Sequence, residues 1–360
     1  MSSEVAGPST SCGQDQVDED VTSQSKRMRL STKSIEITDL NNNCLEHIFK
    51  FLNLNDLLNV AGTCKKFHSA ANYPFSSNFG KKQFHLRYTY IERGSSAFSI
   101  DTFENDIYIR KLKIYLKCLR TFGHLINKLC INYDTMPIRD EIDLYINQYC
   151  SDYVKEIVFC WSMKGAMKNL TKPFPNVWSL AFSSCYLEDE ITNFNEKFPK
   201  MKRLKFSGSN TIATRKCIEM NFSHLENLCI VDVDTHQSDT FFQPNNIATC
   251  IRLNPALREL EIGGELLNIS FIQSVRKHLQ HIEFLGIQLQ SPKSLQLNTG
   301  TISLNIKRLK VDIRSGSMNP ARMPKIPLVS NQLEEFSIKA CNLWVKESLM
   351  DFIKKTPEVN

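Results

Sequence analysis

A six-residue pattern recurs nine times and constrains the fold more than any other feature of the sequence. Its first, fourth and sixth positions are apolar, and its copies are INKLCI at 126, VKEIVF at 154, VWSLAF at 177, MKRLKF at 201, LENLCI at 225, LRELEI at 257, LQHIEF at 279, IKRLKV at 306 and LEEFSI at 333. The end of each copy alternates as a strand with one buried face does. Segments such as DEIDLYINQYC and NNIATCIRLN supply helices between the copies.

The pattern and its spacing resemble leucine-rich repeats. Two copies continue into Cys185-Tyr186-Leu187 and Cys341-Asn342-Leu343, which match the cysteine-type repeat, whereas the other copies lack that cysteine. The resemblance implies an α/β fold over residues 123–360: a curved solenoid of about nine repeats, each one strand plus one helix. The chain stops where a tenth strand would begin, so we expect either a missing C-terminal piece or a capping helix at 345–355.

Period-two alternation places the residues that flank the second apolar position of each copy on the open face of the sheet. On that face we expect a basic spot at the fourth copy, an acidic band at the sixth and seventh, and a second basic spot at the eighth. A banded surface suits a protein ligand of complementary charge. The candidate substrate-binding residues are Arg203, Lys205, Glu259, Glu261, His281, Glu283, Arg308 and Lys310.

A second organised stretch spans residues 38–71 and predicts three short helices. Leu45, Ile48, Phe49 and Leu52 follow helical spacing, and Asn43 with Glu46 predicts the capping box of this first helix. The second helix is expected over 56–61, capped by Asn55 and ended by Gly62, and the third over about 63–71. Helices this short are marginal alone, so their apolar faces must meet a partner or the chain's own later domain.

The order of residues in this stretch resembles the F-box, with expected bounds 34–75. The positions that match are Leu40, Cys44-Leu45, Ile48-Phe49, Leu52, Leu54, Asp56-Leu57-Leu58, Val60 and Cys64-Lys65-Lys66-Phe67. Two residues depart from the usual pattern, since Asn41 replaces a proline and Phe67 replaces a tryptophan. Loss of the proline removes a residue preset for the helix start, while Phe67 keeps an aromatic anchor.

The two resemblances imply a substrate-recognition subunit of a Skp–cullin–F-box ubiquitin ligase. The F-box would bind a Skp-family adaptor and, through it, a cullin, while the repeats bind a protein substrate; the chain itself would be non-catalytic. The implied adaptor-binding residues are Leu40, Leu45, Ile48, Phe49, Leu52, Leu54, Leu57, Leu58, Val60, Cys64 and Phe67. The alternative is a leucine-rich-repeat scaffold that binds protein or RNA independently of ubiquitin.

Two further segments complete the expected domain organisation. Residues 1–33 are polar and predict a disordered tail, whose basic cluster at 26–33 is either a nuclear-import signal or a solvated tail. Residues 76–122 predict a connecting region, with a strand and a helix that cap the repeats. Its mixed aromatic and basic residues also fit an RNA-stacking surface, the less favoured reading.

Composition narrows the remaining functions. The formal charge of +6 is mild for 360 residues, so DNA binding is not expected. Twelve cysteines without a Cys-x-x-Cys pair, and the absence of a signal peptide or long apolar run, predict free thiols in the cytoplasm or nucleus and no membrane. No catalytic or cofactor motif is present. His278 and His281 have a spacing that suits metal ligands, but no zinc-type motif accompanies them, so no metal is expected.

Overall fold

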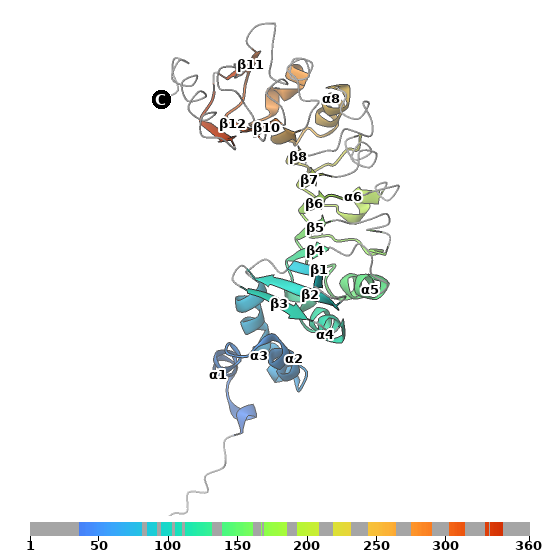
Figure 1. The fold of residues 1–360 in the computed structure, drawn as a ribbon, viewed down its shortest axis with the longest axis vertical. Helices are drawn as coiled ribbons and strands as arrows, with labels where there is room; N and C mark the ends of the chain where they lie inside the picture. Colours follow the sequence, from blue (N-terminus) through green and yellow to red (C-terminus); the bar gives the residue numbers. More distant parts are fainter. Residues whose placement is uncertain are drawn as a thin grey trace, which may run out of the picture. The chain divides into compact units, whose positions relative to one another are not determined.

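The computed structural model describes residues 36–80, 85–91, 95–102, 105–109, 112–131, 139–160, 167, 169–185, 193–208, 219–231, 244–263, 275–289, 302–313, 328–330 and 332–340 (Figure 1). The chain divides into two compact units, residues 1–40 and 41–360. Within the described residues the first unit holds one short 3-10 helix, η1 (Ile37–Asp39). The tail predicted over 1–33 and the capping helix predicted over 345–355 lie outside the described residues.

The second unit begins with three helices and a π-helical turn: α1 (Asn42–Phe49), α2 (Leu54–Ala61), α3 (Lys65–Phe75) and η2 (Ser76–Gly80). The predicted caps are wrong by two residues. Asn41 caps α1 by accepting a hydrogen bond from the Cys44 N–H at 2.9 Å, and Asn53 caps α2 by accepting one from the Asp56 N–H at 3.0 Å. Each lies in extended backbone ahead of its helix, which a cap requires. The third helix also runs four residues beyond its predicted end.

The segment between the helices and the parallel sheet contains a small antiparallel sheet. Its strands are β1 (His85–Ile91), β2 (Ser95–Thr102) and β3 (Asn105–Ile109), in that order. Helix α4 (Leu112–Phe122) and the 3-10 helix η3 (Gly123–Leu125) follow. Because β1 lies beside β4 of the parallel sheet, this segment adjoins the first edge of that sheet (Figure 1).

In the part of the chain that the structure describes, nine parallel strands form the large sheet, and each pairs with the next of these nine along the chain. They are β4 (Lys128–Ile131), β5 (Glu156–Cys160), β6 (Ser179–Ser183), β7 (Arg203–Ser207), β8 (Asn227–Val231), β9 (Glu259–Gly263), β10 (Phe284–Leu289), β12 (Arg308–Ile313) and β14 (Glu335–Ala340). A separate parallel pair joins β11 (Ile302–Leu304) to β13 (Leu328–Ser330). The prediction of an α/β region built on repeated strands is therefore confirmed.

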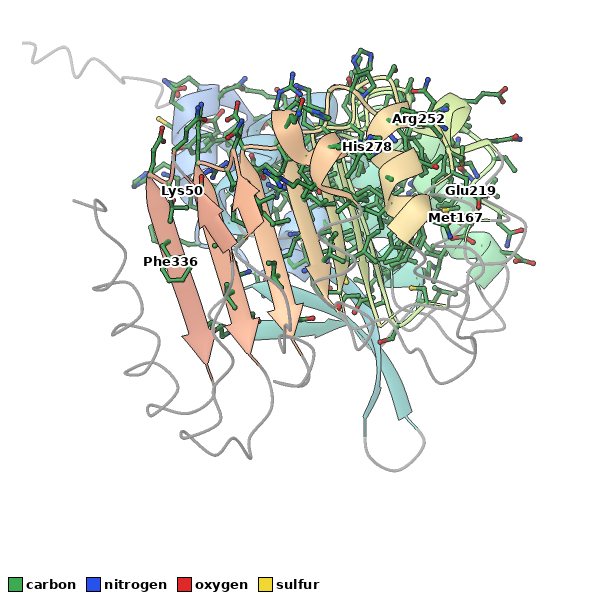
Figure 2. The ribbon with its side chains drawn as sticks, turned by 90° about the horizontal axis from the view of Figure 1, so that it is seen from above. Lys50, Met167, Glu219, Arg252, His278 and Phe336 are labelled. Carbon is green, nitrogen blue, oxygen red and sulfur yellow. The ribbon has the colours of Figure 1, made fainter. Side chains whose placement is uncertain are left out.

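Helical segments lie in the connections between the strands. Among the described residues they are α5 (Arg139–Tyr149), α6 (Phe194–Lys197), α8 (Pro244–Leu253) and the 3-10 helix η5 (Arg276–His281). Helices α5, α6 and α8 lie to the same side of the strands in Figure 1. Arg252 and His278, labelled in Figure 2, belong to α8 and η5, the connections that precede β9 and β10.

Phenylalanine rings form much of the interior between β5 and β7. Phe159, Phe182 and Phe206 stack from strand to strand with centroids 5.2 and 5.4 Å apart, and Phe194 of α6 stacks on Phe182 at 5.9 Å. All four rings are buried. Since each ring packs against the equivalent position of the next strand, neighbouring strands share one continuous core.

The register of β10 corrects the seventh copy of the pattern. Phe284 pairs with Glu259 and Leu285 with Leu260, so the apolar positions of this copy are Ile282, Leu285 and Ile287. The predicted copy began three residues earlier because LQHIEF also has apolar residues at the three required places. The residues that β10 places on the open face are therefore Phe284 and Gly286, so the prediction that placed His281 and Glu283 on that face is wrong.

Candidate functional site: an exposed apolar surface and a charged sheet face

The structure separates the predicted adaptor-binding residues by exposure. Ile48 and Cys64 are exposed, and Leu40, Leu52, Val60 and Phe67 are half-buried. The rest lie in the interior of the helical domain, where they cannot reach a partner without unfolding: Leu45, Phe49, Leu54, Leu57 and Leu58. The expectation that these five residues contact an adaptor directly is therefore corrected. They have a supporting role, because three short helices need an interior of their own.

Besides Ile37 of η1, which is 51% exposed, three large apolar side chains of the helical domain are left exposed, and we name these three the apolar surface. They are Ile48, Phe51 and Tyr73, with exposed fractions of 41%, 81% and 50%. His47 meets the ring of Phe51 edge to face at 5.8 Å, and the Lys50 ammonium, labelled in Figure 2, lies 5.0 Å from the ring centroid of Tyr73. Sequence reasoning missed Phe51 and Tyr73. Phe51 follows Ile48 at helical spacing, which was the available signal.

Polar and aromatic contacts join the helical domain to α4 and η3. The Lys117 ammonium donates to the Asn59 side-chain oxygen at 3.0 Å, and the rings of Phe75 and Phe122 stack with centroids 4.1 Å apart. His124 stacks on His68 at 6.2 Å. Desolvation by burial, together with the neighbouring His68, lowers the pKa of His124, so the neutral imidazole is favoured here.

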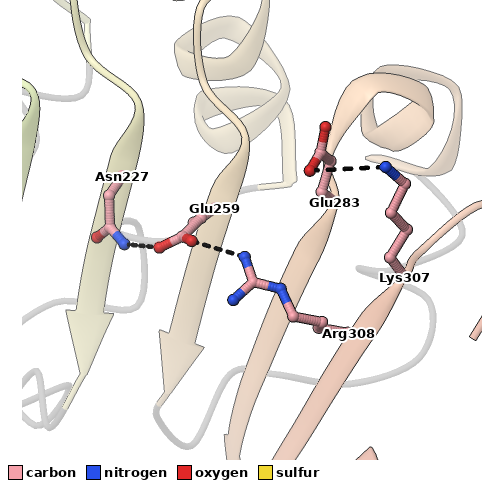
Figure 3. A network of polar contacts seen from close by, with 5 residues as sticks. All are labelled: Asn227, Glu259, Glu283, Lys307 and Arg308. Carbon is pink, nitrogen blue, oxygen red and sulfur yellow. Dashed lines mark hydrogen bonds and ion pairs between the residues drawn. The ribbon is translucent and has the colours of Figure 1, made fainter. Parts of the chain in front are cut away.

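On the open face of the parallel sheet, the predicted charges pair with one another across strands. Arg308 donates to a carboxylate oxygen of Glu259 at 2.7 Å, although β10 lies between them, and Asn227 donates to the other oxygen (Figure 3). The Arg308 guanidinium also lies 5.3 Å from the ring centroid of Phe284, the intervening residue. In a second pair, Lys310 donates to a carboxylate oxygen of Glu261 at 2.8 Å. These two pairs hold four of the predicted substrate-binding residues.

The pKa shifts agree with this pairing. Burial alone would raise the pKa of Glu259, but hydrogen bonds from Arg308 and Asn227 outweigh it and lower that pKa below the ordinary value. The hydrogen bond to Glu259 raises the pKa of Arg308, and the one to Glu261 raises the pKa of Lys310. Each group is thus stabilised in its charged form.

The remaining candidates on the sheet fall into two groups. Arg203 and Lys205 are exposed on β7, as predicted. Glu283 precedes β10 and lies 3.9 Å from Lys307 (Figure 3), and His281 ends η5. Burial, followed by the charges of Arg258 and His278, lowers the pKa of His281.

The cysteine thiols differ in how far they are exposed to solvent. Cys44 and Cys64 are exposed, whereas Cys118 and Cys250 lie in the interior, where desolvation raises the pKa of each to about 12. Within the described ranges, no cluster of three or more His, Cys, Asp or Glu side chains could hold a metal ion. None of the described helices is both long and apolar enough to cross a membrane.

Comparison with known protein families identifies the helical domain. Residues 37–76 match the family model described as the F-box domain. The chain therefore carries an F-box domain, and the match spans η1 to the start of η2 and includes the apolar surface. The large parallel sheet lies outside this match. No curated protein matches the chain.

Proposed function

We propose that this chain is the non-catalytic substrate-recognition subunit of a Skp–cullin–F-box ubiquitin ligase. The F-box domain would bind a Skp-family adaptor, which in turn binds a cullin. The sheet region would capture the protein to be ubiquitinated. Such a subunit works by raising the local concentration of substrate near the ligase.

The observation that carries the proposal is the apolar surface on the matched domain. Ile48, Phe51 and Tyr73 stay exposed although Leu45 and Phe49 of the same stretch are fully buried. Aromatic and aliphatic side chains grouped on one small domain are the type of anchor that protein interfaces use. Asn41, the departure from the usual F-box proline, caps α1 with its side chain, so the helix start keeps a stabilising residue.

We further propose that the sheet region is a leucine-rich-repeat solenoid. Three features support this: one strand for each copy of the pattern, parallel pairing in chain order, and helical segments in the connections. The corrected seventh copy makes the spacing more even, since the sixth, seventh and eighth copies begin at Leu257, Ile282 and Ile306. In such an array every unit shares its core with its neighbours only.

Affinity purification of the full chain from cells tests the proposal. We expect the Skp-family adaptor and a cullin to co-purify and to survive moderate salt, because the contact is apolar. Recovery of RNA that is lost as salt rises, without adaptor or cullin, would instead favour the ubiquitin-independent scaffold. The full chain keeps its N-terminal tail and its sheet region, so the result applies to the intact protein.

A further inference from the structure

The acidic side chains of β9 on the open face already have partners. Glu259 accepts hydrogen bonds on both carboxylate oxygens, from Arg308 and from Asn227. Glu261 accepts from the Lys310 ammonium at 2.8 Å and contacts the Cys229 thiol at 3.7 Å. The charges of β9 and β12 therefore largely neutralise one another, which leaves this part of the face poorly suited to attract a charged ligand.

The basic side chains of β7 differ from those of β12. Arg203 and Lys205 are exposed, and in the described part of the chain no carboxylate lies within ion-pair distance of either. The guanidinium of Arg203 lies 5.7 Å from the ring centroid of Trp178, which immediately precedes β6. Arg203 therefore has an aromatic ring beside it on the β6 side, although its charge also helps to lower the pKa of Glu259.

The neighbouring strand carries short side chains beside these two cations. Arg203 pairs in register with Ser179, and Lys205 with Ala181. Both side chains are short; Ser179 is buried and Ala181 is half-buried, so the accessible sheet surface on this strand lies at Ala181, beside Lys205. Beyond them, Lys128 and Glu156 form an ion pair at 3.3 Å between β4 and β5, which again neutralises its own charge.

We propose that Arg203 and Lys205, with the ring of Trp178 beside them, bind an acidic peptide segment of a protein partner. The carboxylates of that segment would pair with both cations, which point from the same face of one strand two residues apart. Glu259, Glu261, Arg308 and Lys310 serve instead to hold β9 and β12 together. This inference names the substrate class of the proposed receptor and rests on that function for its biological meaning.

The test measures binding of a fluorescein-labelled peptide of alternating Glu and Ser to the purified full chain by fluorescence anisotropy. A peptide of alternating Gln and Ser is the uncharged probe. We expect the Glu probe to bind at low salt and to weaken as salt rises, and the Gln probe not to bind. Arg203→Gln with Lys205→Gln should weaken the Glu probe by about 10-fold or more.

The matched control removes the same two charges elsewhere. Arg276→Gln with Lys277→Gln changes one exposed arginine and one exposed lysine on η5, outside the sheet. We expect this variant to bind as the unaltered chain does. If the β7 variant bound the Glu probe as tightly as the unaltered chain, the two cations would not be needed and the proposal would be overturned. Equal loss of binding in both variants would overturn it too, because only the net charge of the chain would then matter.

A third probe, in which phosphoserine replaces Glu, distinguishes the chemistry of the acid. Binding of the phosphoserine probe without binding of the Glu probe would overturn the assignment to carboxylates. The assay contains no adaptor, so its outcome is independent of adaptor binding. Failure of the proposed peptide-binding site and failure of the proposed ligase function can therefore be told apart.

Discussion

The ring of Phe75, in the last turn of α3, stacks on the ring of Phe122, the last residue of α4, with centroids 4.1 Å and planes 15° apart. Both rings are fully buried. The F-box domain therefore shares part of its interior with the helix that leads into the parallel sheet. A unit of about 40 residues buries too little surface to be stable alone, and this contact supplies part of what it lacks.

Replacing Phe122 with alanine should destabilise the chain by about 3–5 kcal/mol, because it removes a buried ring from a shared interior. Urea unfolding followed by tryptophan fluorescence and circular dichroism measures the change. Phe51→Ala is the matched control, since that ring is exposed and its loss should change stability by no more than about 0.5 kcal/mol. Equal effects of the two substitutions would contradict the shared interior.

Gly286 leaves the space through which Glu261 and Lys310 meet. It lies between them in register, and a Cβ at this position would come within 2.6 Å of the Glu261 Cγ. Gly286→Val should therefore push Glu261 from its partner and cost about 1–3 kcal/mol. Thermal unfolding checks this. Ser337→Val, at the equivalent position of β14, should cost less; a Gly286 variant as stable as the native chain would show that the pair does not need the gap.

The pairing of Glu259 predicts a dependence of stability on pH. Its pKa is lowered in the folded chain, so the unfolded state binds the proton more readily. The carboxylate therefore contributes to the free energy of unfolding above the ordinary pKa of 4.5, and this contribution is lost as the pH falls through the lowered pKa. We expect the stability difference between the native chain and Glu259→Gln to shrink over that acidic range. A difference that stays constant down to the acid transition would contradict the proposed pairing.

Thiol reactivity should follow burial. Cys44 and Cys64 are exposed and should be alkylated by iodoacetamide under native conditions, whereas Cys118, Cys229 and Cys250, each with a pKa raised to about 12, should react only after unfolding. Mass spectrometry of the labelled peptides gives the order directly. Rapid native alkylation of Cys118 or Cys250 would show that these interiors open more readily than the structure indicates.

The sequence predicted most of the parallel sheet because buried strand residues alternate, as Leu204 and Phe206 do. It misplaced one strand because the residues at 279–284 satisfy the same apolar pattern as those at 282–287. It placed the helix caps on the wrong asparagines, since only backbone geometry separates Asn41 from Asn43. The spacing of apolar residues indicated the F-box helices but could not say which side chains face inward.

The paired charges of the sheet face were beyond sequence reasoning. Glu259 and Arg308 belong to strands that are not direct neighbours, so their contact depends on the register of β10 between them. The sequence identified both residues as outward-facing and assigned them to ligand binding. The structure shows that they bind each other, whereas Arg203 and Lys205 have no carboxylate within ion-pair distance among the described residues.

The most direct test of the account is the affinity of the purified chain for a Skp-family adaptor, measured by isothermal titration calorimetry. Ile48→Asp with Phe51→Asp should lower that affinity by about 100-fold or more, because two exposed anchors are replaced by charge. The control, Leu144→Asp with Tyr153→Asp, changes two exposed apolar residues outside the F-box domain and should leave the affinity unchanged. Unaltered adaptor binding by the first variant, with the fold intact, would contradict the proposed function of the apolar surface.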